Sequence, residues 1–491
     1  MKILLVVANS KKWPLSIPDC EVVSARKYLT EPIFSRLSGV RVFNLMHPCR
    51  YQSQGYYVSL LAEARGHRPV PNITTLRDLH TPAMVRMTDA AISELVQKSL
   101  TGIRSQRFEL SIYFGRNLAR KYDKLCRELF NRFHAHFLRA VFVRNKDIWT
   151  LQNISPISIN EIPQSHHDFV EEAAGNYFTK AGYRQRKVQQ FRYSLAILHH
   201  PDEKEAPSNA AALKKFIRAG QKLGLDTQLI TKEDFGRLSE YDALFIRETT
   251  NVNNHTFRFA RYAEADGLVV IDDPQSIIRC ANKVFLAELL EHHRIPTPKT
   301  MIVHRDNVDL ITHTLGFPCV LKQPDSAFSV GVKKVERADT LALVAEQMLE
   351  KSELIIAQEY LPTDFDWRVG ILDSKVIFVC RYYMARDHWQ IVKRDQHGEK
   401  QEGDADTLNP NDAPDEVLRI ALKAAAPIGN GLYGVDVKQV GSRFYVIEVN
   451  DNPNIDAGLE DALLQDRLYH QVMSIFLQRI EEKKLVSRAA K

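Results

Sequence analysis

The feature that most constrains this chain lies near its carboxyl end, where two strand-like runs flank a short turn. Residues 434–438 and 444–450 are rich in β-branched side chains, and Val440-Gly441-Ser442 between them predicts a β-hairpin. Because the midpoint of positions 436 and 448 falls inside the turn, Asp436 and Glu448 should face each other across the strands. Strand alternation adds Asn450 to their face and puts Val435, Val437, Tyr445, Ile447 and Val449 on the other.

Two carboxylates and an amide oxygen on one strand face need a cation to offset their repulsion. Hard oxygen ligands of this kind suit Mg²⁺, which keeps some of its waters and shares nucleotide phosphates. The alternative interpretation is an exposed acidic pair that Lys438 neutralises. The hairpin alone leaves both interpretations open.

Length and composition bound the answer further. At 491 residues the chain is long enough for about three domains, and 44% apolar residues are typical of a soluble globular protein. The net charge of +6 permits acidic ligands such as nucleotides and does not favour nucleic acid. The sequence contains no run of 18 apolar residues, so we expect no membrane span.

Neither the cysteines nor the histidines have the spacing of a metal site. The six cysteines are far apart with no CxxC pair, which predicts reduced thiols in a cytoplasmic protein, and the 17 histidines lack a zinc spacing. The apolar run 3–8 is followed by Lys11-Lys12 and not by a cleavage site, so it predicts a first strand and not a signal peptide.

Four segments follow from composition and periodicity. Residues 1–143 open with that strand and end in a basic, aromatic region that we expect to be helical, with an apolar core stripe at helical spacing. Residues 144–191 predict an irregular connection with some helix around 169–181. Residues 192–295 alternate strands and helices as in a parallel βαβ layer, and strands dominate after residue 296. The stripe consists of Leu118, Tyr122, Leu125, Leu129 and Phe133.

A lysine before a small-residue loop is a candidate phosphate contact. A strand ends on Lys322, and a second strand starts near Val332 after the loop. Small residues let backbone N–H groups approach phosphate oxygens, with the lysine as a point charge. It is not a Walker A motif, since the lysine precedes the loop and no helix follows. A hairpin loop with a solvated lysine is the alternative.

A strand at 354–359 leads into a proline-ended linker and then Asp366-Trp367-Arg368. Such a linker offers backbone donors and acceptors to an adenine edge. Asp366 would accept hydrogen bonds from ribose, and Arg368 would pair with a carboxylate or phosphate. A strand end with a structural Asp–Arg pair explains the pattern equally well.

The order of these motifs along about 170 residues resembles the ATP-grasp superfamily, most closely its RimK-like carboxylate–amine ligases. The ordered set is Lys283, Lys322, the small-residue loop, Gln358-Glu359-Tyr360, Asp366-x-Arg368, Asp436 and Glu448-x-Asn450. The resemblance covers roughly residues 192–480, and residues 1–143 resemble the amino-terminal domain of one RimK-like branch. It implies a multidomain α/β and α+β fold: an N-terminal α/β domain (1–143), a linker (144–191), a βαβ pre-ATP-grasp domain (192–295) and an ATP-grasp domain (296–491).

The resemblance implies a role for each motif residue. Two lysines and a covering loop would contact the ATP phosphates. The hinge would hold adenine, and the hairpin would bind two Mg²⁺ or Mn²⁺ ions. The residues that would contact phosphate are Lys283, Lys322, Ser326, Ser329 and Gly331, and those of the hinge are Glu359 and Tyr360. Asp366 would accept from ribose, and the metal ligands would be Asp436, Glu448 and Asn450. Asn452 would position the substrate or a phosphate.

One departure from the family pattern concerns the catalytic cation. RimK-type enzymes have Arg-x-Asn on a strand before the first metal carboxylate, and Trp389 and Ile391 stand at those positions here. We expect Arg381 or Lys393 to serve instead, with Arg368 as a further catalytic candidate.

The resemblance implies an ATP-dependent ligase that joins a carboxylate to an amine through an acyl phosphate, with amino acid or glutamate addition as one possibility. An ATP-dependent phosphotransferase and a nucleotide-binding regulatory module without ligase chemistry are the alternatives. The expected partners are small-molecule or peptide carboxylates and amines, with no membrane and no nucleic acid, and homo-oligomerisation is left open.

Overall fold

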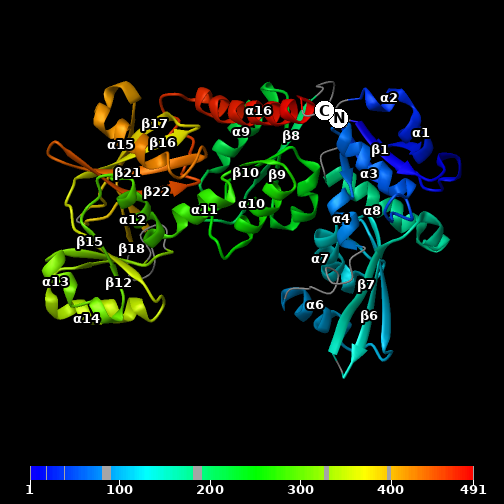
Figure 1. The fold of residues 1–491 in the computed structure, drawn as a ribbon, viewed down its shortest axis with the longest axis horizontal. Coiled ribbons are helices and arrows are strands. Elements are labelled where there is room, and N and C mark those ends of the chain that lie inside the picture. The colour runs from blue at the N-terminus through cyan, green and yellow to red at the C-terminus, as the bar shows by residue number, and fades with distance from the viewer. Residues whose placement is uncertain are drawn as a thin grey trace. The chain divides into compact units, whose positions relative to one another are not determined.

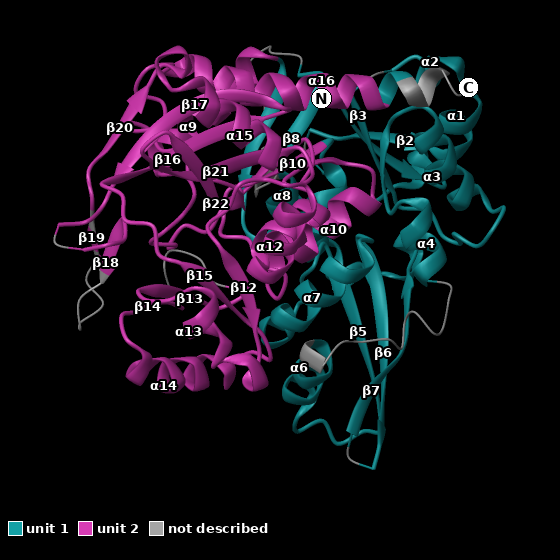
Figure 2. Cartoon of the chain, turned by 60° about the vertical axis from the view of Figure 1, so that its left-hand side comes forward, with its two compact units in different colours: residues 1–195, 224–242, 484–491 teal, residues 196–223, 243–483 magenta. Residues whose placement is uncertain are grey.

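The computed structural model describes residues 2–79, 90–180, 191–325, 331–394 and 400–489, except positions 18, 38, 147 and 387. The chain divides into two compact units (Figure 2). Unit 1 comprises residues 1–195, 224–242 and 484–491, and unit 2 comprises residues 196–223 and 243–483. Within the described residues, every helix is too short or too polar to cross a membrane.

Unit 1 begins with a parallel sheet in the order β2-β1-β3-β4 (Figure 1). The run predicted as a first strand is β1, and five of its six residues are buried. The strands are β1 (Lys2–Val7), β2 (Glu21–Ser24), β3 (Val40–Asn44) and β4 (Arg68–Val70), and the helices between and after them are α1 (Ala25–Thr30), α2 (Pro32–Ser35), α3 (Gln54–Ala64) and α4 (Ile73–Leu79).

A second, antiparallel sheet of unit 1 corrects two predictions. The expected helix across 114–143 is limited to α7 (Asp123–Phe133), because residues 137–145 form strand β6, in which buried and half-buried positions alternate from 138 to 143. The expected irregular stretch after residue 144 contains strand β7, paired with β6 along its length. The helix expected around 169–181 is confirmed as α8. The sheet has the order β5-β6-β7, formed by β5 (Arg107–Tyr113), β6 (Phe137–Asn145) and β7 (Ile148–Pro156), and the helices α6 (Ala90–Leu100) and α8 (His167–Lys180) belong to the same unit. From later in the chain, unit 1 also contains the 3-10 helix η5 (Lys232–Glu240) and β9 (Leu225–Ile230), which is a strand of another sheet.

The predicted apolar stripe packs into the core of this unit with one exception. Tyr122, Leu125, Leu129 and Phe133 belong to the buried cluster between α7 and the sheet. Leu118 lies before the helix and is 42% exposed.

The first part of unit 2 has the predicted parallel pairing, which β10 and β11 form. Asn282 caps the last helix of this part by accepting from the backbone N–H groups of Val284 and Phe285. The elements are β8 (Tyr193–Leu198), α9 (Ala210–Lys222), β10 (Ala243–Ile246), α10 (His255–Ala265), β11 (Val269–Ile271), α11 (Pro274–Ala281) and α12 (Lys283–His292).

Two larger antiparallel sheets and the antiparallel pair β18-β19 make up the rest of unit 2. The first has the order β12-β15-β13-β14 and the second β20-β17-β16-β21-β22. Helix α15 covers the second sheet through the core around Val417, Trp367 and Val435. The elements are β12 (Thr300–Val303), α13 (Leu310–Thr314), β13 (Cys319–Lys322), β14 (Val332–Val335), α14 (Ala338–Leu349), β15 (Ile355–Glu359), β16 (Phe365–Leu372), β17 (Lys375–Tyr383), β18 (Val392–Arg394), β19 (Lys400–Glu402), β20 (Ala405–Leu408), α15 (Asp415–Ala425), β21 (Leu432–Val440), β22 (Arg443–Asp451) and α16 (Asp466–Ala489).

Candidate active site

The hairpin that opened the sequence argument is β21 and β22, and Asp436 lies opposite Glu448, as predicted. One part of the predicted pattern is wrong, because the register shifts by one residue after Asp436. The bulge places Val446, and not Ile447, against Val437 on the core face. Ile447 and Glu448 therefore both line the cleft described next.

A cavity of about 150 Å³ lies between the two antiparallel sheets of unit 2. Seven residues predicted from sequence line it, from both sheets and the start of α12. They are Lys283, Lys322, Glu359, Tyr360, Asp366, Asp436 and Glu448. The motifs that are spread over about 170 residues of sequence therefore meet at one site.

Two lysines give the cleft positive charge. The ammonium of Lys322 donates to Oε1 of Gln358 at 2.7 Å, and its side chain is buried. Burial lowers the pKa of Lys322 to about 8, although Glu448 acts against this shift. Lys283 is the first residue of α12, and its ammonium lies 3.4 Å from Oε2 of Glu448.

The hinge residues stand at the end of β15. The backbone N–H of Glu359 donates to the carbonyl of Lys299 at 2.8 Å. The ammonium of Lys334 lies 4.4 Å from the ring centroid of Tyr360, and the Trp389 ring meets Tyr360 edge-on at 5.9 Å. This aromatic wall is suited to a flat, apolar base.

Asp366 is held by a residue that the sequence argument assigned elsewhere. Lys438 donates to Oδ1 of Asp366 at 2.6 Å, and Thr363 donates to the same oxygen at 3.0 Å. Lys438 therefore pairs with Asp366. The alternative interpretation, in which Lys438 neutralises Asp436 and Glu448, is wrong.

Arg368 is the cation that contacts Asp436, the first of the two hairpin carboxylates. Its guanidinium donates to both oxygens of Asp436, at 2.8 Å for Oδ2, and Asn450 donates to Oδ2 at 3.2 Å. Burial raises the pKa of Asp436 despite Arg368. Burial also acts on Glu448, but there Lys283, Lys322 and Arg368 outweigh it and hold the pKa below its ordinary value. The raised pKa of Asp436 indicates a carboxylate that gains from more positive charge nearby.

The donor set fits a hard divalent cation. Asp436 and Glu448 are directly opposed, and the side-chain amide of Asn450 contacts Asp436 on the same face. Oxygen ligands of this kind, with room for phosphate oxygens and water, suit Mg²⁺ or Mn²⁺. In the described part of the chain, no group of three or more His, Cys, Asp or Glu side chains is arranged to hold a metal ion by itself.

The structure does not bring the other candidates into the cleft lining. Arg381 pairs with Trp367 across the strands and forms an ion pair with Asp406, Nε to Oδ1 at 3.0 Å. It therefore shares a face with the core residue Trp367, opposite to that of Arg368. Lys393 is half-buried on β18.

Asn452 and the loop residues complete the list. The side chain of Asn452 is buried, accepts from Arg247 at 2.6 Å and donates to the carbonyl of Glu248 at 2.7 Å. Gly331 ends the loop with a φ of 77°, and its carbonyl accepts from the backbone N–H of Gln323 at 2.9 Å. Ser326 and Ser329 lie outside the described residues.

Sequence reasoning missed several lining residues. Val320 and Val332 could have been found from alternation, since Val320 precedes Lys322 by two residues and Val332 pairs with Lys322 across the strands. Ile447 could not, because only the bulge turns it to the cleft. The missed lining residues are Pro298, Val320, Val332, Leu361, Gln390, Lys438 and Ile447.

Two family models match the chain. Residues 25–173 match the RimK-like ATPgrasp N-terminal domain, and residues 280–463 match the RimK-like ATP-grasp domain. The chain belongs to the RimK-like ATP-grasp proteins, and the predicted family and fold are confirmed.

Curated relatives are ligases. The alpha-aminoadipate–LysW ligase LysX of Saccharolobus solfataricus is 28% identical over 254 residues, 49% of this chain and 88% of the relative. A "Probable alpha-L-glutamate ligase" of Marinomonas sp. is 25% identical over 293 residues, 56% of this chain and 92% of the relative. The predicted enzyme class, an ATP-grasp carboxylate–amine ligase, is confirmed at this level.

Two solved structures match parts of the chain. The D-alanine–D-alanine ligase of Bacillus anthracis complexed with ATP has 18% identity and a TM-score of 0.46, covering 59% of this chain and 99% of that one. An ATP-grasp RimK domain protein of Sphaerobacter thermophilus has 16% identity and a TM-score of 0.44, covering 57% and 98%.

Proposed function

We propose that the cleft of unit 2 activates a substrate carboxylate with ATP and passes the acyl group to an amine. The observation that carries this proposal is the meeting of Lys283 and Lys322 with Asp436 and Glu448 around one cavity. Arg368 lies behind this lining and holds Asp436. Cations hold and neutralise phosphates, and opposed carboxylates bind divalent metal, so the set has the parts of a phosphoryl-transfer site.

Each residue has a proposed role in the first step. Lys283 and Lys322 hold ATP phosphates, Tyr360 and Glu359 hold adenine, and Asp366, fixed by Lys438, accepts from ribose. Mg²⁺ or Mn²⁺, as two ions on Asp436, Glu448 and Asn450, would neutralise charge on the phosphates. The substrate carboxylate then attacks the γ-phosphorus in line, and the bond to ADP breaks.

In the second step the amine attacks the acyl carbon, the bond from that carbon to the phosphate oxygen breaks, and inorganic phosphate leaves. We assign to Arg368 the stabilisation of charge in both steps, since of the three candidate cations it is the one that contacts the proposed metal ligand Asp436. Amino acids, glutamate among them, are the proposed amine donors, because the named relatives are amino-acid ligases.

We also propose that the domains of the chain end at residues 143, 191 and 295, as expected from the sequence. The cytoplasm is the proposed location, in keeping with six free cysteines. Small molecules or peptides are the proposed carboxylates.

The test is ADP release by the full chain with amino acids and peptides supplied in pairs, with mass spectrometry of the products. We expect Asp436→Ala and Glu448→Ala to abolish ADP release while the protein stays folded at the assay temperature. Asp415→Ala, which removes an exposed carboxylate on α15, should leave ADP release unchanged. Undiminished turnover in both cleft variants would exclude the proposal. A phosphorylated product that persists when amines are present would replace ligation by phosphoryl transfer.

A further inference from the structure

The net charge of +6 hides a strong difference between the two units. Unit 1 contains 34 Lys and Arg against 20 Asp and Glu, a formal net charge of +14, whereas unit 2 contains 32 against 40, a net charge of −8. Net charge acts on association, because a field of one sign attracts ligands of the other. The catalytic unit by itself therefore repels acidic macromolecules, and unit 1 attracts them.

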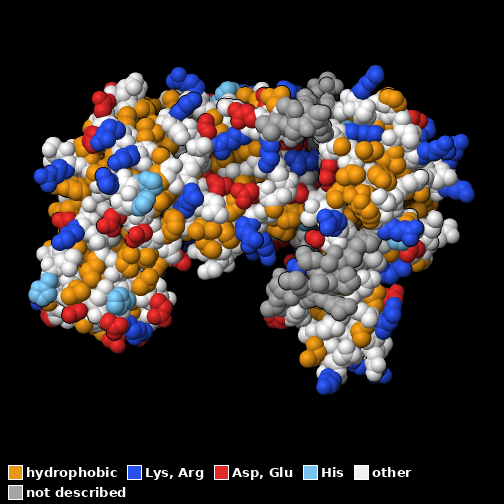
Figure 3. Space-filling view, viewed as in Figure 1, with side chains coloured by type: hydrophobic (Ala, Val, Ile, Leu, Met, Phe, Trp, Pro, Cys, Tyr) orange, Lys and Arg blue, Asp and Glu red, His pale blue; other side chains and the backbone are white. Residues whose placement is uncertain are grey.

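The positive charge of unit 1 is concentrated in α7 and the β5–β7 sheet. Residues 104–146 contain 11 Lys and Arg but only three acidic residues. Figure 3 shows Lys and Arg side chains along the edge and at the tip of the part that Figure 1 labels β6 and β7. The acidic residues in this stretch are Glu109, Asp123 and Glu128.

Four of these cations form what we call the basic stripe, Arg120, Lys121, Lys124 and Arg127, along the 3-10 helix η2 (Arg120–Tyr122) and α7. Positions 120, 124 and 127 have helical spacing and share one face, and Lys121 borders it. All four are exposed, while the opposite face of α7 is in the core.

The stripe is not consumed by contacts within the protein. Among the residues that the structure describes, none of the four side chains forms an ion pair. The ammonium of Lys121 lies 4.7 Å from the ring centroid of Tyr122. Asp123 of the same helix is engaged by the backbone N–H of Asn117 at 3.2 Å. Keeping four cations close together costs repulsion, which an acidic ligand would relieve.

The chemistry of the stripe favours a polypeptide over a nucleic acid. Single-stranded nucleic acids need exposed aromatic rings for stacking, and the aromatic ring within the stripe, Tyr122, is buried. Leu118, which is 42% exposed, lies two residues before Arg120 and offers an apolar contact that a phosphate backbone would not use.

We propose that the basic stripe of unit 1 docks an acidic polypeptide, the carboxylate-rich substrate that the ligase extends or modifies. The inference rests on the proposed function for the reason such a partner is bound, but the stripe itself lies outside the ATP-binding cleft. Unit 1 thereby offsets the repulsion of the acidic catalytic unit and raises the local concentration of substrate.

The test is fluorescence anisotropy of a labelled oligoglutamate peptide with the full chain, without ATP. We expect binding that weakens as salt rises from about 50 to 300 mM, and Lys124→Glu/Arg127→Glu to weaken it about tenfold or more. The matched control Arg26→Glu/Lys27→Glu makes the same charge change on α1 and should weaken binding less than about threefold.

Three results would overturn the proposal: no binding of oligoglutamate at low salt, an equal loss in the control, or tighter binding of an oligonucleotide of the same charge. ADP release with amino acids and peptides supplied in pairs is measured on the wild type and on each variant. If oligoglutamate does not bind but ADP release is intact, the docking role of the basic stripe is refuted and the proposed ligase activity is not. If the wild type releases no ADP, the proposed ligase activity is refuted and the binding result is unaffected.

Discussion

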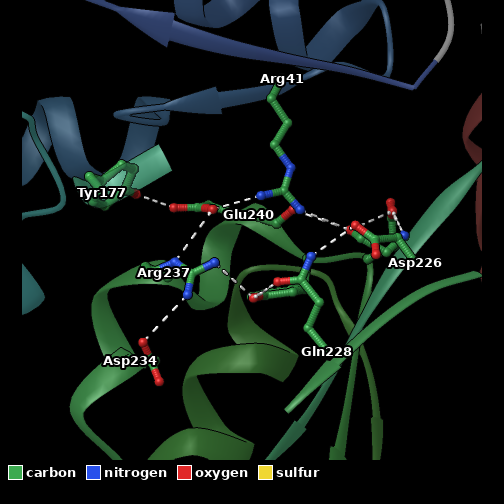
Figure 4. Close-up of polar contacts among 10 residues, drawn as sticks. Arg41, Tyr177, Asp226, Gln228, Asp234, Arg237 and Glu240 are labelled. Carbon is green, nitrogen blue, oxygen red and sulfur yellow. Dashed lines mark hydrogen bonds and ion pairs between the residues drawn. The ribbon is translucent and has the colours of Figure 1, made fainter. Parts of the chain in front are cut away.

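A buried ionic cluster in unit 1 allows one stability prediction to be worked out from contacts (Figure 4). Glu240 is 1% exposed, and its carboxylate accepts from Arg41 at 2.6 Å and from the hydroxyl of Tyr177. Arg237 lies 3.8 Å from the same carboxylate and donates to Tyr241 at 3.0 Å. Glu240 belongs to η5, so one carboxylate joins β3, α8 and η5 within the unit.

The predicted perturbation is Glu240→Ala, which removes the shared acceptor. Arg41 is also only 1% exposed, so its charge stays buried in the variant without the carboxylate. Breaking a buried ion pair by removing one partner costs about 3–5 kcal/mol. For a unit of this size each kcal/mol lowers the midpoint by about 2–4 °C, so we expect a loss of roughly 10 °C.

The assay is differential scanning calorimetry of the full chain, with hydrogen exchange to assign the transition to unit 1. Glu233→Ala is the matched control, since Glu233 is an exposed carboxylate of the same helix η5, and we expect less than about 1 kcal/mol there. The double variant Arg41→Met/Glu240→Leu should recover most of the loss, because an apolar pair avoids the cost of burying charge. A Glu240→Ala transition within about 2 °C of wild type would refute the reasoning.

Three further predictions concern the cleft and the pH dependence. Arg368→Ala should lower the rate of ADP release by about a hundredfold or more, since it removes the cation on Asp436, and single-turnover kinetics check this. Lys438→Met should raise the KM for ATP more than it lowers kcat, because it frees Asp366; an unchanged KM would contradict the assignment of Asp366 to ribose. Burial lowers the pKa of His134 to about 4 and of His136 to about 3, so both stay neutral when folded and gain a proton on unfolding below pH 6.5. Stability should be full above about pH 7 and fall by roughly 4 kcal/mol by pH 5, and His136→Phe should halve that fall in urea titrations.

Much of unit 2 could be predicted because its signals are local. The facing of Asp436 and Glu448 followed from the position of a turn, and the parallel pairing of β10 and β11 from the alternation of strands and helices. The errors in unit 1 have a different cause. Residues 137–145 satisfy both a helical and a strand interpretation over short windows, and only pairing with β5 and β7 selects the strand. The charge difference was invisible because a whole-chain sum cancels it.

The catalytic cation shows what sequence cannot supply even when the motifs are found. A regular hairpin around the Asp373–Ser374 turn would pair Asp366 with Arg381 and bring Arg381 to the cleft face. The register shifts by one residue between Gly370 and Ile371, so Asp366 pairs with Tyr382 and Arg381 turns to the face of Trp367. A bulge has no periodic signature, and a single one exchanges the two faces of a strand beyond it. The bulge does not affect Arg368, because its partner Asp436 belongs to β21, the strand on the other edge of β16. The register between β16 and β21 is unbroken from position 367 to position 372. The assignment of the cation therefore depends on which of two neighbouring strands carries a bulge, and that is decided by packing of the whole sheet.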